Sequence, residues 1–206
     1  IKAFVNQAQE IIYRGGRAEA VAISGNERIP CDAVVLASAG GALPLISGTG
    51  FRAPLTSLTG FTLTLELSDS EALPALTVAS PEKGFILSRL DRRLRATGRF
   101  FLGSPAEKEK KAECNRLYDA VMGSFENLRS NTVASQFWSG EFLASPDRFP
   151  LAGPVPGADN VILNIAHGPF GLAGAGESAE IAAASALGED PGEFAAFCSP
   201  GRFAEK

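Results

Sequence analysis

Two runs of apolar residues constrain the fold of this chain more than any other feature. They are 33–37 (Ala-Val-Val-Leu-Ala) and 161–166 (Val-Ile-Leu-Asn-Ile-Ala). Neither run alternates regularly with polar residues, and such strands are typical of a parallel sheet that is covered on both faces. We therefore predict that 32–40 and 161–166 are neighbouring strands of one sheet, although most of the chain lies between them.

The segment between these runs has the pattern of a different sheet. Apolar and polar residues alternate strictly in 61–67, and 84–88 and 93–97 look like a pair of half-buried strands. Residues 106–128 carry apolar residues at helical spacing, which predicts one long helix. We expect these strands to form an antiparallel sheet separate from that of the two apolar runs.

Turn signals organise the two ends of the chain. Gly15-Gly16 joins two strand-like segments, 10–14 and 18–24, and predicts a hairpin turn. Near the other end, the glycine-rich stretch 167–176 is expected to be a turn that opens an alanine-rich helix over 177–187.

Residues 133–153 contain prolines, glycines and the single tryptophan, Trp138. We interpret them as an ordered loop, which either covers the sheet or forms one wall of a site. Together the elements predict an α+β fold, in which an antiparallel sheet domain is inserted between two parts of an α/β layer that pack together.

Composition excludes several classes of function. The net charge of −4 argues against nucleic acid as a partner, and no stretch reaches the roughly 18 apolar residues of a membrane span. The three cysteines lie too far apart in the chain for a disulfide framework or a zinc site, which favours a reducing, cytoplasmic compartment. Because the sequence starts at Ile1 and its only methionine is Met122, we expect a processed chain or a fragment.

The glycine turn is the segment best suited to chemistry. A helix N-terminus offers unpaired N–H groups and partial positive charge, and Gly168 and Gly171 allow close approach of a ligand. The alternative is a turn that only packs strand against helix. His167, the single histidine, is a catalytic candidate or a structural hydrogen-bonding group, and no metal site is expected. Residues 174–179 match G-x-G-x-x-A formally, but their distance from the strand rejects a dinucleotide fingerprint.

Taken together, several motifs resemble the D-amino-acid oxidase-like superfamily of FAD-dependent enzymes. They occur in the family's order along nearly the whole chain, at 32–40, 54–61, 90–98, 138–153, 164–171 and 197–203. The resemblance implies a partial FAD-binding layer in 1–45, an antiparallel-sheet substrate domain with one long helix in 46–150, and a returning strand, turn, helix and C-terminal tail in 151–206.

The resemblance also implies roles for individual residues. The segments expected to meet the flavin contain Ala37, Gly40, His167, Gly168, Pro169, Phe170, Gly171 and Leu172. Substrate-binding candidates are Phe61, Phe142 and Arg148. Phe142 stands where dehydrogenase relatives are expected to have an arginine that faces a substrate carboxylate, and Arg148 is a possible substitute.

The family's G-x-G-x-x-G segment is not found in this sequence, so we expect that the chain alone neither retains FAD nor is active. A missing N-terminal FAD-binding segment, or a partner chain, would then complete an enzyme that oxidises the C–N bond of a small amine or amino acid. Two alternatives remain. One is a non-catalytic module derived from such a domain, which binds a ligand or a partner. The other is an unrelated, complete α+β protein.

Overall fold

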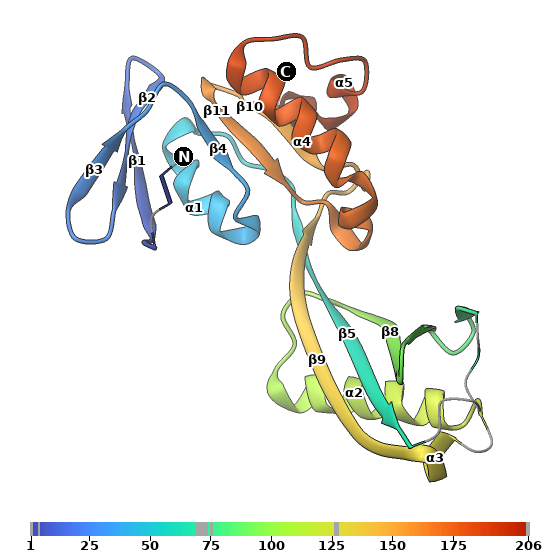
Figure 1. Ribbon diagram of the computed structural model, residues 1–206. Coiled ribbons are helices and arrows are strands. Elements are labelled where there is room, and N and C mark those ends of the chain that lie inside the picture. The colour runs from blue at the N-terminus through green and yellow to red at the C-terminus, as the bar shows by residue number, and fades with distance from the viewer. Residues whose placement is uncertain (1, 4, 69–73, 75, 126–127, 205–206) are drawn as a thin grey trace. The chain divides into compact units, whose positions relative to one another are not determined.

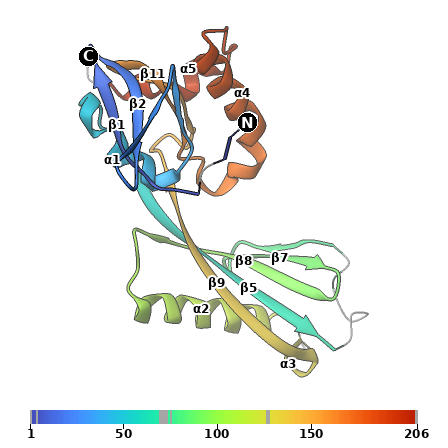
Figure 2. The ribbon, with the colours of Figure 1, turned by 60° about the vertical axis from the view of Figure 1, so that its left-hand side comes forward.

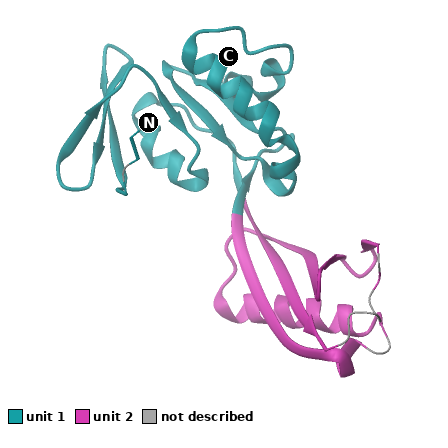
Figure 3. Ribbon diagram, in the orientation of Figure 1, with its two compact units in different colours: residues 1–56, 142–206 teal, residues 57–141 magenta. Residues whose placement is uncertain are grey.

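The computed structural model describes residues 2–3, 5–68, 74, 76–125 and 128–204, and it has the expected α+β composition. It divides into two compact units (Figure 3). Unit 1 consists of Ile1–Thr56 and Phe142–Lys206, and unit 2 of Ser57–Glu141. The boundaries expected after residues 45 and 150 are therefore displaced. The chain enters unit 2 along β5 and leaves it along β9, where we had expected a loop.

Unit 1 contains two three-stranded sheets. The first has the order β1-β2-β3, with β1 Ala8–Arg14, β2 Arg17–Ile23 and β3 Glu27–Pro30. The second has the order β10-β11-β4, with β10 Leu151–Val155, β11 Ala158–Ile165 and β4 Val34–Leu36. β11 and β4 are parallel, with Val161 opposite Val34. The predicted pairing of the two apolar runs is thus confirmed, and so is the hairpin at Gly15-Gly16.

Short helices and one long helix complete unit 1. They are η1 Ala39–Gly41, α1 Ala42–Leu45, η2 Ser47–Thr49, η3 Gly168–Phe170, α4 Gly171–Leu187, α5 Ala195–Cys198 and η4 Pro200–Phe203. Helix α4 packs on one face of β10-β11-β4 (Figure 1). Among the described helices, none is long and apolar enough to cross a membrane.

The two faces of β10-β11-β4 are covered unequally. Val34, Leu36 and Leu163 point to the face that packs against β1, β2 and α1, and each is less than 9% exposed. Val35 points to the opposite face and is 48% exposed, because α4 lies mainly over β10 and β11. The prediction that this strand is covered on both faces is therefore wrong for β4. Within the described chain, β4 is also an edge strand, paired on one side only.

A buried amide side chain joins three segments of unit 1. Asn160, at the start of β11, accepts a hydrogen bond from the backbone N–H of Ala18 (2.9 Å) and donates to the carbonyls of Ala18 (2.8 Å) and Asp32 (2.9 Å). Every polar atom of this side chain, which is 6% exposed, therefore has a partner. These bonds hold β2 and the residues just before β4 against β11.

Unit 2 is an antiparallel sheet covered by a helix. Its sheet has the order β6-β7-β8-β5-β9, with β5 Thr56–Leu67, β6 Val78–Ser80, β7 Phe85–Leu90, β8 Arg93–Leu102 and β9 Thr132–Ala144. The helices are α2 Glu107–Met122 and α3 Leu128–Asn131. α2 lies along one face of the sheet (Figure 2). The strands predicted at 61–67, 84–88 and 93–97 are confirmed as members of this separate sheet.

Two predictions in unit 2 are corrected by the structure. The long helix ends at Met122 instead of 128, because Gly123 caps it and a glycine in a helix interior costs about 1 kcal/mol. Residues 126–127 of the predicted helix lie outside the described residues. The stretch 133–153 is not one loop, since 132–144 forms the edge strand β9. Pairing with β5 imposes this extended conformation, which the irregular sequence pattern of β9 does not reveal.

The helix predicted over 177–187 begins six residues earlier, at Gly171. Three glycines, Gly171, Gly174 and Gly176, are therefore helical despite their low helix propensity. Ile181 packs in one buried cluster with Ala152 of β10, and α4 contacts both β10 and β11, so tertiary packing overrides the local preference.

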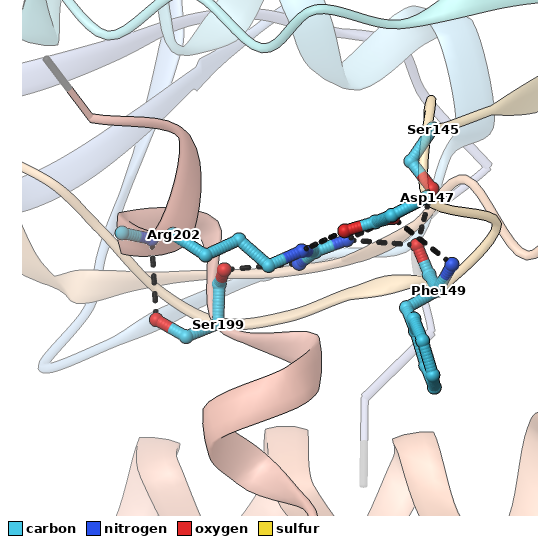
Figure 4. Close-up of polar contacts among 6 residues, drawn as sticks. Ser145, Asp147, Phe149, Ser199 and Arg202 are labelled. Carbon is cyan, nitrogen blue, oxygen red and sulfur yellow. Dashed lines mark hydrogen bonds and ion pairs between the residues drawn. The ribbon is translucent and has the colours of Figure 1, made fainter.

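A polar cluster ties the C-terminal turn η4 to the turn at 145–149 (Figure 4). Arg202 binds Asp147 through two hydrogen bonds, Nε to Oδ2 at 2.8 Å and Nη2 to Oδ1 at 3.1 Å. The same guanidinium donates to the carbonyls of Phe149 and Ser199. Arg202 is the main cause that lowers the pKa of Asp147 from 3.8 to about 2, aided by Ser145 and the Phe149 N–H.

This cluster predicts a pH dependence of stability. The folded pKa of Asp147 is depressed, so its contribution is present above pH 3.8 and is lost as the pH falls through about 2. The Asp147 side chain is 37% exposed, so after discounting for solvent screening we expect this contribution to be about 1 kcal/mol. The difference in the free energy of unfolding between the wild type and Arg202→Met, measured with urea, should therefore shrink as the pH falls from about 4 to about 2.

Arg28→Met is the matched control, because Arg28 lies on β3 and forms no ion pair among the described residues. Its stability difference from the wild type should not change over this pH range. A difference for Arg202→Met that stays constant down to the lowest pH would show that Asp147 and Arg202 are not coupled in the folded protein.

Candidate functional site

A cleft opens where the parallel strands β4 and β11 end. It has a volume of about 430 Å³, which is within the usual range for small-molecule sites. Its lining residues are mostly small or apolar and include no charged side chain: Ala37, Ala39, Phe142, Leu143, Asn164, Ile165, Ala166, His167, Gly168, Gly171, Ala175, Ser178 and Ala179. All belong to unit 1. The carboxyl ends of parallel strands are where open α/β sheets bind ligands.

The turn after β11 has an unusual backbone. Ala166 and Gly168 both have positive φ, of 62° and 59°. This conformation costs a non-glycine residue free energy, so the buried surroundings of Ala166 must hold it. Gly171, in contrast, has a helical φ of −52°. The absence of a side chain at Gly171 leaves room for His167, because a Cβ at Gly171 would lie 3.0 Å from Cβ of His167.

The side chain of His167 is held by two neighbours. Nε2 lies 3.0 Å from Oδ1 of Asn164 and 2.9 Å from Oγ of Ser178. Asn164 belongs to β11 and Ser178 to α4, so the imidazole bridges the strand and the helix that flank the turn. Partial burial lowers the pKa of His167 below its usual value of 6.5. Burial therefore favours the neutral form of the imidazole.

The N-terminus of α4 adds polar groups of a second kind. No side chain caps the helix, and its first turn contains no acidic residue. The first N–H groups of an α-helix lack intrahelical partners and carry partial positive charge. They can therefore donate to an anion or a polarised carbonyl placed against the turn.

The structure brings some of the predicted site residues together and separates others. Ala37, Phe142, His167, Gly168 and Gly171 line the cleft. The other predicted flavin contacts, Gly40, Pro169, Phe170 and Leu172, are not part of its lining, and Leu172 is 95% exposed.

The other two substrate candidates lie elsewhere. Phe61 is 1% exposed within the core of unit 2. Arg148 occupies the exposed turn at 145–149 with a φ of 67°.

Several cleft residues were missed by sequence reasoning, notably Asn164, Ser178, Ala175 and Ala179. The signal was present, since Gly171, Ala175 and Ala179 recur every fourth residue, which is the spacing of one helix face. It was hidden because we expected the helix to start at 177. Within the described residues, no group of three or more acidic, histidine or cysteine side chains could hold a metal ion.

Comparison with known proteins identifies the family of this chain. The family model of the FAD dependent oxidoreductases (DAO) matches residues 2–185. The chain belongs to this family. The resemblance inferred from the motifs is thus confirmed, and the alternative of an unrelated α+β protein is wrong.

Relatives agree with this assignment. The chain is 28% identical to a D-amino acid dehydrogenase of Xanthobacter autotrophicus over 193 residues, which cover 94% of this chain and 45% of the relative. It is 30% identical to a D-amino acid dehydrogenase of Sinorhizobium medicae, covering 82% of this chain and 40% of the relative. The chain thus spans less than half the length of these two relatives.

Solved structures show the same fold at low sequence identity. Glycine oxidase from Geobacillus kaustophilus superposes with a TM-score of 0.78 at 16% identity, over 97% of this chain and 53% of that one. L-amino acid deaminase from Proteus vulgaris gives a TM-score of 0.75 at 20% identity, over 96% and 49%.

The residues of the cleft fit the flavin that this family uses. A planar ring system can lie against a surface that side chains do not obstruct. Ala37, Ala39, Gly168 and Gly171 provide small residues at the strand ends and the turn, and no charged group lines the cleft. The small, uncharged lining of the cleft is therefore compatible with the flat ring of the family's cofactor.

The close contact at Gly171 gives a test with an internal control. Gly171 and Gly174 are both helical in α4, but a Cβ at Gly174 meets nothing within 4 Å. Gly174→Ala should stabilise the protein by about 0.5–1 kcal/mol through helix propensity. Gly171→Ala should lose this gain and be at least about 1 kcal/mol less stable than Gly174→Ala, because His167 must move. Thermal unfolding measures both, and equal stabilisation would mean that Gly171 is not needed for this packing.

Proposed function

We propose that this chain is the part of an FAD-dependent oxidoreductase that contains the candidate flavin cleft, and that the whole protein oxidises the C–N bond of an amine or amino acid. The observation that carries the proposal is the uncharged cleft at the carboxyl ends of β4 and β11, which the glycine turn borders. The match of the chain to the family model supports the same proposal. The names of the relatives, which include D-amino acid dehydrogenases, support the substrate class.

The groups around this cleft would act mainly by position and electrostatics. Bound flavin supplies the acceptor for the electron pair of the substrate. The uncapped N–H groups of α4 would stabilise negative charge placed against the turn, and their orientation is fixed before any reaction. The apolar lining, to which Phe142 and Leu143 contribute, would keep water away from the site.

The open edge of β4 supports a further part of the proposal. Parallel strands normally have neighbours on both sides and helices on both faces, but β4 is an edge strand and Val35 is half exposed. We propose that an FAD-binding segment, of the same chain or of a partner chain, adds a strand beside β4 and supplies the phosphate-binding turn. The free cysteines Cys31, Cys114 and Cys198 support a reducing, cytoplasmic location.

The proposed activity is tested by reduction of the bound flavin. The protein is isolated from its natural source with its cofactor and mixed without oxygen with D-amino acids, L-amino acids and N-methylated glycine, each in turn. Bleaching of the visible flavin absorbance by at least one of these compounds is expected. Carboxylic acids that lack the amine are the control. A protein that retains flavin but is bleached by none of the amines would contradict C–N oxidation and favour a non-catalytic binding module.

A separate prediction concerns the 206-residue chain by itself. We expect it to fold but not to retain FAD through dialysis, because the described residues contain no phosphate-binding βαβ unit. The measurement is the ratio of visible to ultraviolet absorbance after purification and dialysis with added FAD. A stoichiometric flavin band after dialysis would show that the cleft and the α4 N-terminus suffice for binding.

A further inference from the structure

The hydrogen bonds around His167 determine which of its ring nitrogens carries the proton. The neutral imidazole has one N–H donor and one lone-pair acceptor, and the choice depends on the partners of each nitrogen. Only Nε2 has partners in the described part of the chain, namely Asn164 Oδ1 and Ser178 Oγ. The question is whether these oxygens accept from Nε2 or donate to it.

The hydroxyl of Ser178 has a competing acceptor. Its Oγ lies 3.2 Å from the carbonyl oxygen of Ala175, one helical turn earlier, and a carbonyl can only accept. Ser178 is 2% exposed, so its single hydrogen has few other directions available. With that hydrogen directed to Ala175, the lone pairs of Oγ are left to accept from Nε2 of His167.

Asn164 leads to the same assignment. Its amide oxygen, which can only accept, lies 3.0 Å from Nε2 of His167. A lone pair on Nε2 would require Asn164 to turn its NH₂ group toward the ring and Ser178 to give up Ala175. A proton on Nε2 satisfies both neighbours at once, through one N–H shared between two acceptors.

We propose that His167 is locked by Asn164 and Ser178 as the neutral Nε2–H tautomer, and that it offers Nδ1 to the cleft as a hydrogen-bond acceptor. The cleft would then favour a molecule that presents an N–H or O–H donor to this position. His167 would then orient the bound molecule by accepting a hydrogen bond from it, and would not supply a proton to it. The positive partial charge at the turn would come from the main-chain N–H groups of α4 alone.

The electrostatic surroundings support a neutral ring. Burial lowers the pKa of His167, and no charged side chain lines the cleft. Charged side chains do occur on the segments that surround the cleft. They are Glu177 and Glu180 of α4, Asp159 of β11, and Asp147 and Arg148 of the turn between β9 and β10. Asp147 is paired with Arg202, and none of the five lies in the lining of the cleft.

This inference rests on the proposed function, because it concerns the same cleft. Its test, however, needs no flavin. His167 is the only histidine of the chain, so ¹⁵N-histidine labelling gives the signals of one ring. Two-bond ¹H–¹⁵N correlation at pH 7 should show a protonated Nε2 and an unprotonated Nδ1, with a titration midpoint below 6.5. A proton on Nδ1, averaging between tautomers, or an imidazolium at pH 7 would overturn the proposal. Failure of flavin reduction would leave this result unaffected.

Variants of the two neighbours sharpen the test. Asn164→Asp places a carboxylate beside Nε2 and should raise the pKa of His167 by about one unit or more. Ser178→Ala removes one acceptor and should increase the population of the Nδ1–H tautomer, while Ser185→Ala, at a position of α4 outside the cleft lining, should change nothing. If neither Asn164→Asp nor Ser178→Ala alters the spectrum, these residues do not hold the ring and the proposal is wrong.

Discussion

The parallel pairing of β4 with β11 is the interaction on which the rest of unit 1 depends. The two strands are distant in the chain, and the loop entropy lost when they meet has to be offset by buried contacts. Val161 and Leu163 supply apolar burial on one face, and Asn160 supplies three hydrogen bonds at the beginning of β11. An unpaired amide at this buried position would be costly, so Asn160 favours this alignment over a shifted one.

The candidate site follows from this pairing. Two parallel strands that end together leave their following residues side by side, here the segments 37–39 and 166–168. Helix α4 then starts beside the cleft, and Gly171, Ala175 and Ala179 on one side of the helix line it. Small residues at the strand ends and on the first turns of α4 keep the space open, and Gly171 leaves room for the imidazole of His167.

The charged side chains of unit 1 lie outside the lining of the cleft. The ion pair between Asp147 and Arg202 ties η4 to the turn at 145–149, and neither residue lines the cleft. Among the described residues, the polar side chains that line the cleft are those of Asn164, His167 and Ser178, and none is an acidic residue, a lysine or an arginine. Neutral groups in a partly buried site preserve the influence of the helix N-terminus, which a nearby charge would outweigh.

The sequence by itself determined the classes of strand and their partition into two sheets. Continuous apolar runs marked β4 and β11, and strict alternation marked β5, so these strands could be recognised locally, although β4 is covered on only one face in the described chain. It also located the start of the glycine turn at His167, although not its end, because the helix begins at Gly171. Motif order was sufficient to indicate the family.

Only the tertiary structure decided the features that depend on distant contacts. Strand β9 is extended because β5 pairs with it, and Gly171 is helical because the helix that follows it packs on the sheet. Phe61 is a core residue and Arg148 an exposed turn residue for the same reason, since burial is set by neighbours remote in the chain. The partners of His167 could not be read from the sequence either, because they are brought to the ring by β11 and by a helix whose first turns have little helical propensity of their own.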